Sequence, residues 1–223
     1  MQSLQRPVEI TLSNFWKVRV HSFSDFYHFF ELFVTRPYDL PDLKDPKLIV
    51  DVGANIGMFT MRAKKLYPES HVISYEPVSL NFKRLHENII GNDIEGVELV
   101  NKGVAGESRS ETIYLHPENT GGHSIFPSQV PNTSNSIDIE LESIRNVLRN
   151  ANAPIDLLKL DCEGAEGEII MSLSRSHANK IRRMIIETTF GLYDKREFLS
   201  KLSELGYVYR IHNGLLVAEH AEG

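Results

Sequence analysis

The pattern of apolar and polar positions predicts strands that alternate with amphipathic helices from residue 47 to about residue 205. Strands and helices that alternate in this way are typical of an α/β domain, in which a mostly parallel sheet carries helices on both faces. The short β-rich runs are residues 47–52, 71–75, 97–101, 155–161 and 183–187, and the amphipathic stretches are residues 58–66, 79–90, 165–173 and 195–205.

Two stretches are rich in residues that favour turns. Residues 207–211 and 215–218 flank the dipeptide Asn213-Gly214, a strong hairpin signal, so we expect the sheet to end in an antiparallel pair. Residues 116–135 are rich in Pro, Asn, Gly and Ser and predict an irregular loop. A loop of this length in a compact domain is often functional or mobile.

The segment before residue 47 departs from the alternation. Residues 15–20 predict a strand, and Ser24 is a candidate N-cap for a following helix. That helix either packs on the core or forms a lid over a ligand site. We therefore expect an N-terminal extension at residues 1–46 and the main domain at residues 47–223. The aromatic residues at helical spacing are Phe26, Phe29, Phe30 and Phe33.

The composition of this chain of 223 residues limits the classes of partner and the compartment that we expect. Its 30 acidic and 24 basic residues give a formal charge of -6, which argues against nucleic acid and suits a neutral or cationic partner. Cys162 is the single cysteine, so no internal disulfide can form and a reducing compartment is expected. The N-terminus lacks a signal pattern and no apolar run approaches about 20 residues, so we expect a cytoplasmic protein without a membrane partner.

The sequence VDVGANIG at residues 50–57 predicts a strand, a tight turn and the start of a helix. Gly53 and Gly57 lack side chains that would keep a ligand away from the backbone of this turn. The dinucleotide pattern G-x-G-x-x-G is absent, and Asp51 lies two positions before the first glycine. Because a carboxylate repels phosphate, Asp51 suits a ligand that carries an amine or another positive group.

The second strand ends in an acid followed by proline, at Glu76, which lies 25 residues after Asp51. An acid there is placed to accept hydrogen bonds from both hydroxyls of a ribose. Taken alone, Glu76 could equally be a solvated acid at a strand end. An acid for an amino group together with an acid for a ribose indicates S-adenosylmethionine. After the third strand, Asn101 or the pair Gly103 and Val104 are candidates to line the adenine edge.

The fourth strand carries a second acidic motif, LLKLDCEGAE. Alternation places Lys159 and Asp161 on one side of the strand. Asp161, Glu163 and Glu166 crowd three acids around a glycine, which is costly without a counter-ion, a hydrogen-bonding ligand or a raised pKa. The motif therefore predicts either a catalytic or ligand-binding cluster, or helix capping by Glu163 or Glu166.

The motifs VDVGANIG, SYEP and LLKLDCEGAE, in this order, resemble the FkbM-type family of S-adenosylmethionine-dependent methyltransferases over roughly residues 47–190. The resemblance implies a seven-stranded class I methyltransferase fold and methyl transfer to a hydroxyl oxygen of a sugar, polyketide or similar metabolite. Cys162 stands where the family often has valine. By motif, the resemblance implies that Asp51, Gly53, Asn55 and Gly57 hold the methionine part, that Glu76 holds the ribose, and that Asp161 and Glu163 border the transfer site.

Transfer to an alcohol needs a nearby base, and several residues are candidates. Asp161 is the first, at the end of the fourth strand, and Lys159 either tunes Asp161 or orients the acceptor. His123 follows two glycines in the irregular loop and could act as a base or as a metal ligand. A divalent metal held by Asp161, Glu163, Glu187 and His123 stays open, because no ligand spacing specifically supports it.

Other functional classes make different demands on the sequence. An NAD-dependent oxidoreductase should show G-x-G-x-x-G, and a non-catalytic S-adenosylmethionine-binding module should show a degraded fourth-strand motif. An enzyme that methylates amines of nucleic acids should show a basic face or an N-P-P-Y-like turn. We expect instead a small-molecule or glycan acceptor, in a pocket built by residues 24–40 and 116–135. Tyr38 either faces the cofactor or packs on the domain as a turn residue.

Overall fold

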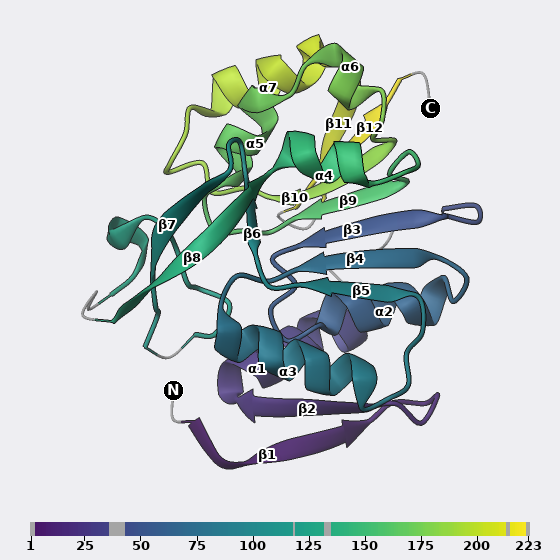
Figure 1. Ribbon diagram of the computed structural model, residues 1–223, viewed down its shortest axis with the longest axis vertical. Helices are drawn as coiled ribbons and strands as arrows, with labels where there is room; N and C mark the ends of the chain where they lie inside the picture. Colours follow the sequence, from purple (N-terminus) through teal and green to yellow (C-terminus); the bar gives the residue numbers. More distant parts are fainter. Residues whose placement is uncertain (1–2, 36–42, 118, 132–134, 213–214, 222–223) are drawn as a thin grey trace.

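A seven-stranded sheet forms the centre of the computed structural model, which describes residues 3–35, 43–117, 119–131, 135–212 and 215–221 (Figure 1). The sheet order is β11 (Tyr207–His212), β12 (Leu215–His220), β10 (Arg183–Glu187), β9 (Leu157–Leu160), β3 (Leu48–Val52), β4 (His71–Tyr75) and β5 (Val97–Val100). The strands from β10 to β5 in this order run parallel, and β12 is antiparallel to both β10 and β11. This confirms the expected α/β fold with an antiparallel end; the dipeptide Asn213-Gly214 lies outside the described residues.

Strand β3 is buried on both faces, and its alternating side chains enter two different cores. Val50 and Val52 pack in one core with residues of α4 (Ile144–Asn150), α5 (Glu166–Ser172) and α7 (Lys195–Glu204). Ile49 packs in the other with α2 (Met58–Leu66), α3 (Ser79–Ile90) and the N-terminal segment. None of the helices in the described part of the chain has the length and apolar character needed to span a bilayer.

The N-terminal segment forms a hairpin and a helix, with boundaries that differ from the prediction. Strands β1 (Ser3–Thr11) and β2 (Lys17–Ser22) pair antiparallel, and α1 (Phe23–Phe30) follows directly, extended by a π-helical turn η1 (Glu31–Thr35). The prediction of Ser24 as N-cap was wrong. Ser22 accepts the Asp25 amide and Asp25 accepts the Ser22 amide, so an S-x-x-D capping box begins the helix two residues earlier.

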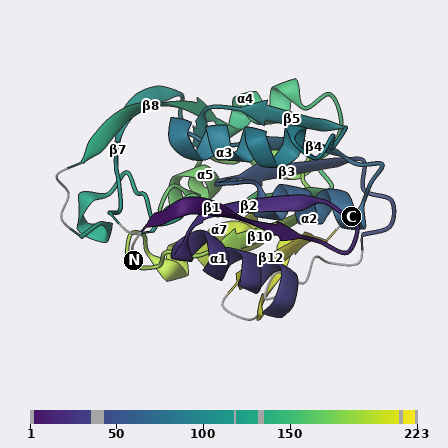
Figure 2. The same cartoon turned by 90° about the horizontal axis from the view of Figure 1, so that it is seen from below.

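Asn88 of α3 and Asn92 in the turn after that helix attach this hairpin to the main domain. The Asn92 side chain accepts the Lys17 amide at 2.6 Å and donates to the Lys17 carbonyl at 2.8 Å, as a neighbouring strand would. One turn earlier, Asn88 accepts the Arg19 amide at 2.8 Å. The hairpin therefore lies beside α3, at the bottom of Figure 1 and in front in Figure 2.

A second, three-stranded sheet lies beyond the carboxyl ends of the central strands (Figure 1). It was not predicted, because β6 is very short and β7 is half-exposed. On its apolar face Ile113, Ile139 and Leu141 pack with Val78, which follows β4. The strands of this second sheet are β6 (Gly103–Ala105), β7 (Arg109–Tyr114) and β8 (Ser136–Ser143). Helix α4, the short helix α6 (Arg175–Ala178) and the 3-10 turn η2 (Pro127–Gln129) in the irregular loop were also not predicted.

Candidate active site

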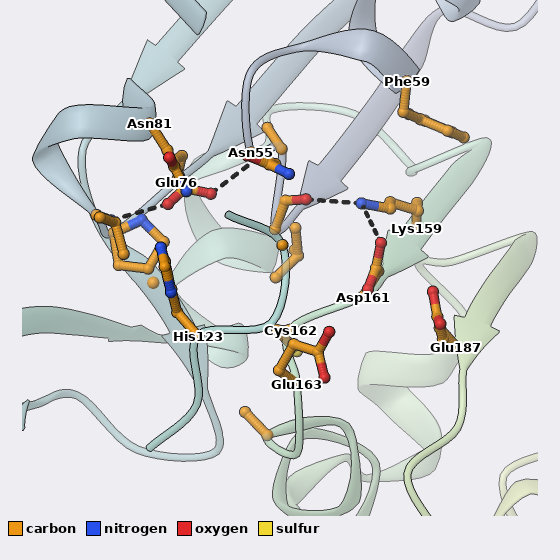
Figure 3. A pocket seen from close by; sticks show the side chains of 18 of the residues that line it. Asn55, Phe59, Glu76, Asn81, His123, Lys159, Asp161, Cys162, Glu163 and Glu187 are labelled. Carbon is orange, nitrogen blue, oxygen red and sulfur yellow. Dashed lines mark hydrogen bonds and ion pairs between the residues drawn. The ribbon is translucent and has the colours of Figure 1, made fainter. Parts of the chain in front are cut away.

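A cavity of about 250 Å³ opens at the carboxyl ends of β3, β4 and β9 (Figure 3). In open α/β sheets this edge is where ligands bind, because the turns after parallel strands meet there. Helix α1, the loop after β7 and the second sheet complete its walls. The cavity brings together ten residues proposed from the sequence: Gly53, Asn55, Glu76, Gly103, Val104, His123, Lys159, Asp161, Glu163 and Glu187.

The turn after β3 places three residues in the left-handed backbone region. Gly53 has φ 78°, Asn55 φ 49° and Gly57 φ 90°, conformations that favour Gly and Asn. A Cβ on Gly53 would lie 1.8 Å from the Asp161 carbonyl oxygen, so only glycine lets this turn pack against the end of β9. Gly57 is outside the lining of the cavity, and a Cβ there would meet the Leu85 side chain at 2.6 Å.

Glu76, at the end of β4, is a buried carboxylate with its oxygens partly engaged. Oε2 accepts the Asn55 amide and Oε1 accepts the Val78 amide, both at 2.9 Å, which leaves acceptor capacity on each oxygen (Figure 3). Burial raises the pKa of Glu76 to about 7, against the two amide hydrogen bonds. Nearby, Asn55 Oδ1 is buried and has no hydrogen-bond partner among the described residues, as expected for an atom that contacts a ligand.

Lys159 ties the turn after β3 to the end of β9. Its ammonium lies 3.1 Å from Asp161 Oδ2 (Figure 3). It also lies 2.7 Å from the Gly53 carbonyl and 3.2 Å from Asp51 Oδ1. Burial lowers the pKa of Lys159, but the Asp161 and Asp51 carboxylates outweigh it and hold the pKa above its ordinary value. Asp51 also accepts the Thr60 hydroxyl and is fully buried outside the cavity lining. Its amine partner in this structure is Lys159, and a direct ligand contact stays a prediction.

Glu166 organises the turn after β9. Its carboxylate accepts the Cys162 amide at 2.8 Å and the Gly164 amide at 2.9 Å, so it caps the turn from the first residue of α5. Glu163 lies between these two amides with φ 54°, and the Ser124 hydroxyl donates to its carbonyl at 2.7 Å. The helix capping predicted for Glu163 or Glu166 is not seen, because the N-cap of α5 is Ala165 and it has no side-chain cap hydrogen bond. Glu166 instead holds the turn that precedes the helix, and the Glu163 side chain lies at the cavity.

Three carboxyl groups border the open end of the cavity: Asp161, Glu163 and, from the end of β10, Glu187 (Figure 3). Burial raises the pKa of Glu163 to about 8, and the charges of Asp161 and Glu187 add to this effect. Burial likewise raises the pKa of the Cys162 thiol, which argues against a thiolate nucleophile. No group of three or more described His, Cys, Asp or Glu residues is arranged to hold a metal ion.

His123 lines the cavity as a mostly buried residue of the loop after β7. Its Nδ1 accepts the His116 amide at 2.9 Å, and burial lowers its pKa to about 4. A neutral imidazole that accepts at Nδ1 carries its proton on Nε2, so the remaining nitrogen is a donor. This geometry suits His123 to hydrogen bonding with a ligand better than to proton abstraction.

Asn101 is not part of the cavity lining. Its amide donates to the Glu76 carbonyl at 2.8 Å and to the Pro77 carbonyl at 3.2 Å, so it supports the turn that carries Glu76. Gly103 and Val104, the alternative weighed for the adenine edge, do line the cavity. Tyr38 lies outside the described residues.

Helix α1 and the loop after β7 meet over the cavity through a pair of side-chain hydrogen bonds. Ser24 Oγ donates to Asn119 Oδ1 at 2.5 Å, and Thr120 Oγ1 donates to Asp25 Oδ1 at 2.7 Å. We call these four residues the clasp. The partners are 95 residues apart in the chain, and no local pattern could have paired them.

The N-terminal segment contributes residues to the lining of the cavity. His28, Glu31 and Leu32, which lie within the range 24–40 predicted to build the pocket, enter from α1 and η1, with His28 Nδ1 3.8 Å from the Glu31 carboxylate. A Cβ on Gly121 would lie 2.7 Å from His28 Nε2, so the His28 ring would have to shift to admit a side chain at this position. The aromatic helix therefore both packs on the core, through Phe29, and borders the cavity.

Comparison with known proteins agrees with this geometry. A family model described as the methyltransferase FkbM domain matches residues 51–209. This chain belongs to the FkbM methyltransferase family. Methyltransferase 1 of Beauveria bassiana is 26% identical over 175 residues, which cover 70% of each protein. The 31-O-demethyl-FK506 methyltransferase FkbM of Streptomyces tacrolimicus is 24% identical over 206 residues, which cover 80% of this chain and 76% of that relative.

The fold of this FkbM-family methyltransferase is also similar to a solved structure, that of methyltransferase FkbM from Methylobacillus flagellatus. The TM-score is 0.56 at 17% sequence identity, with 87% of this chain covered. The chain spans 50% of the length of that protein. At this identity the likeness concerns the class I methyltransferase fold alone.

Proposed function

We propose that this FkbM-family chain is an S-adenosylmethionine-dependent O-methyltransferase that acts on a hydroxyl of a small molecule, polyketide or sugar. The observation that carries the cofactor assignment is Glu76, a buried acceptor with free capacity on both oxygens, at the end of the strand next to the glycine turn. Vicinal ribose hydroxyls are the donors that such a carboxylate recognises.

The residues of the cavity fit this cofactor. Gly53 and Asn55, with its unpartnered Oδ1, would hold the methionine part, and Glu76 the ribose. Gly103 and Val104 would line the adenine. When bound, S-adenosylmethionine supplies a methyl group on a positively charged sulfur, which needs an aligned acceptor and a route for the acceptor's proton.

The open end of the cavity favours an uncharged or cationic acceptor. Glu163 and Glu187 border it and Glu31 lines the same cavity, whereas the Lys159 ammonium is buried and engaged by Asp51 and Asp161. An acceptor with phosphate or carboxylate groups would meet these acids unfavourably. Transfer to oxygen is further supported by the relative from Streptomyces tacrolimicus, which is named for O-methylation.

The acceptor atom can be tested with S-adenosylmethionine labelled with ¹³C in the methyl group. The protein is incubated with a panel of neutral sugars, amino sugars and macrolide polyketides, and release of S-adenosylhomocysteine is measured. For each acceptor that reacts, NMR then locates the label. We expect a carbon shift typical of O–CH3; label on nitrogen or carbon would contradict O-methylation and leave the cofactor assignment intact.

A further inference from the structure

The three carboxyl groups at the open end of the cavity are not equivalent. Asp161 lies 3.1 Å from the Lys159 ammonium, and accepting a proton would cost it that ion pair. Glu163 has no such partner: in the described part of the chain no Lys or Arg forms an ion pair with its carboxyl group. It is therefore better placed than Asp161 to take up and release a proton.

The backbone around Glu163 fixes where this carboxyl group lies. Glu166 accepts the amides on both sides of Glu163, and Ser124 donates to the carbonyl between them. A Cβ on Gly164 would meet the Phe126 ring at 2.8 Å, so the turn is packed closely on the loop after β7. With its backbone held in the left-handed region, Glu163 presents its side chain to the cavity beside Asp161 (Figure 3).

The groups that face Glu163 keep it protonated at neutral pH while no positively charged ligand is bound. Burial is the largest cause, followed by Asp161 from β9, Glu187 from β10 and Glu166 from α5, with Lys159 opposing them. The resulting pKa of about 8 leaves most of Glu163 as the neutral acid at pH 7. A positive charge placed among these acids would lower that pKa and release the proton.

We propose that Glu163 is the general base of the transfer step, and that the positive charge of the methylated cofactor converts it from the acid to the carboxylate. The inference rests on the proposed function. In the step itself, the acceptor O–H proton passes to the Glu163 carboxylate and the oxygen's electron pair forms the bond to the methyl carbon. The S–CH3 bond breaks with its electron pair left on sulfur. The base is therefore active with the charged cofactor and inactive with the neutral product.

Proton release on ligand binding tests this without an acceptor. S-adenosylmethionine and S-adenosylhomocysteine are titrated into the protein by calorimetry at pH 7, each in phosphate and in Tris buffer, whose ionisation enthalpies differ. The wild-type protein should release up to about one proton more with the methylated cofactor than with the product. Both ligands carry ionisable groups of their own, so the comparison depends on a variant that lacks only the Glu163 carboxyl group.

Glu163→Gln is that variant, and it should lose this excess of released protons while still binding both ligands. Glu163→Asn serves as a second variant, because Asn tolerates the left-handed backbone at this position. Glu197→Gln, the same change at an exposed site on α7, should behave as wild type.

Two results would overturn the assignment of Glu163: no excess proton release in the wild type, or the same excess in both Glu163 variants. Failure of a folded protein to bind either ligand would instead overturn the proposed function, and the inference with it.

Discussion

At the scale of single residues, Lys159 shows what a sequence pattern can and cannot predict about a side chain. Alternation predicted that Lys159 and Asp161 share one side of a strand, and their side chains lie 3.1 Å apart. The same reasoning could not show that Asp51, predicted to meet a ligand amine, is fully buried against the Lys159 ammonium. Periodicity gives the direction of a side chain, whereas burial depth depends on which strands are neighbours in the sheet.

Replacement of Lys159 by Met should destabilise the protein strongly. The change leaves the buried Asp51 carboxylate without its cation, which costs about 3–5 kcal/mol in comparable ion pairs. Chemical denaturation measures the loss. The double variant Lys159→Met/Asp51→Asn should recover part of it, and a single variant as stable as wild type would show that this cluster does not hold the turn.

Glu76 should make binding of the product S-adenosylhomocysteine dependent on pH. With a pKa of about 7, Glu76 becomes protonated as the pH falls and loses the charge that accepts the ribose hydrogen bonds. The affinity for S-adenosylhomocysteine should therefore be about tenfold lower at pH 6 than at pH 8. Calorimetry at both pH values measures this change. In Glu76→Gln the affinity should be lower and nearly independent of pH, and a wild-type affinity that is equal at both would argue against Glu76 as the ribose ligand.

At the scale of elements, the long periodic segments were predictable and the connections between them were not. Predicted boundaries for residues 58–66, 71–75 and 79–90 match α2, β4 and α3, because each has a clear apolar period and a turn at its end. The second sheet was missed, since a strand as short as β6 gives no period to detect. The clasp was equally invisible, because it depends on which loop reaches α1.

The clasp should control how fast the cofactor leaves the cavity. Thr120→Val removes the hydrogen bond to Asp25 without changing the volume of the side chain, and leaves the capping box of α1 intact. We expect a faster dissociation rate for S-adenosylhomocysteine, by stopped-flow, with a loss of unfolding free energy of no more than about 1 kcal/mol.

Thr112→Val is the matched control, because it removes an exposed hydrogen bond to Asp138 on the second sheet, outside the cavity lining. The same acceleration in both variants, or none in Thr120→Val, would show that the clasp does not gate the cavity.

At the scale of the whole molecule, the predicted boundary between an N-terminal extension and the main domain at residue 46 stays a prediction. The structure shows which contacts join the two segments. Asn88 and Asn92 fasten the N-terminal hairpin to α3, and Leu12, Val18 and Val20 are buried in the core shared with α2. The sequence does not reveal these contacts, since a side chain that pairs with a distant strand leaves no local signal. The N-terminal segment is thus packed as part of one structure.

The stability of the cofactor-free protein should fall as the pH rises from 6.5 to 8.5. Glu163 has a folded pKa of about 8 and an ordinary value of 4.5, so between these values the folded state binds more protons than the unfolded state. Its contribution to stability is complete below pH 4.5 and is lost as the pH rises through 8. Thermal unfolding should show a Tm several degrees lower at pH 8.5.

Glu163→Gln should show a smaller fall in Tm over the same interval. An equal fall in the variant would mean that groups other than Glu163 set the dependence of stability on pH.

The central claim is that the cavity at the ends of β3, β4 and β9 binds S-adenosylmethionine, and the most direct measurement is calorimetric titration of the purified protein with S-adenosylhomocysteine, with NAD as the comparison ligand. We predict saturable binding of one S-adenosylhomocysteine per chain, weakened at least tenfold in Glu76→Ala, and no binding of NAD. A folded protein that binds NAD and not S-adenosylhomocysteine would contradict the assignment of the glycine turn and of Glu76.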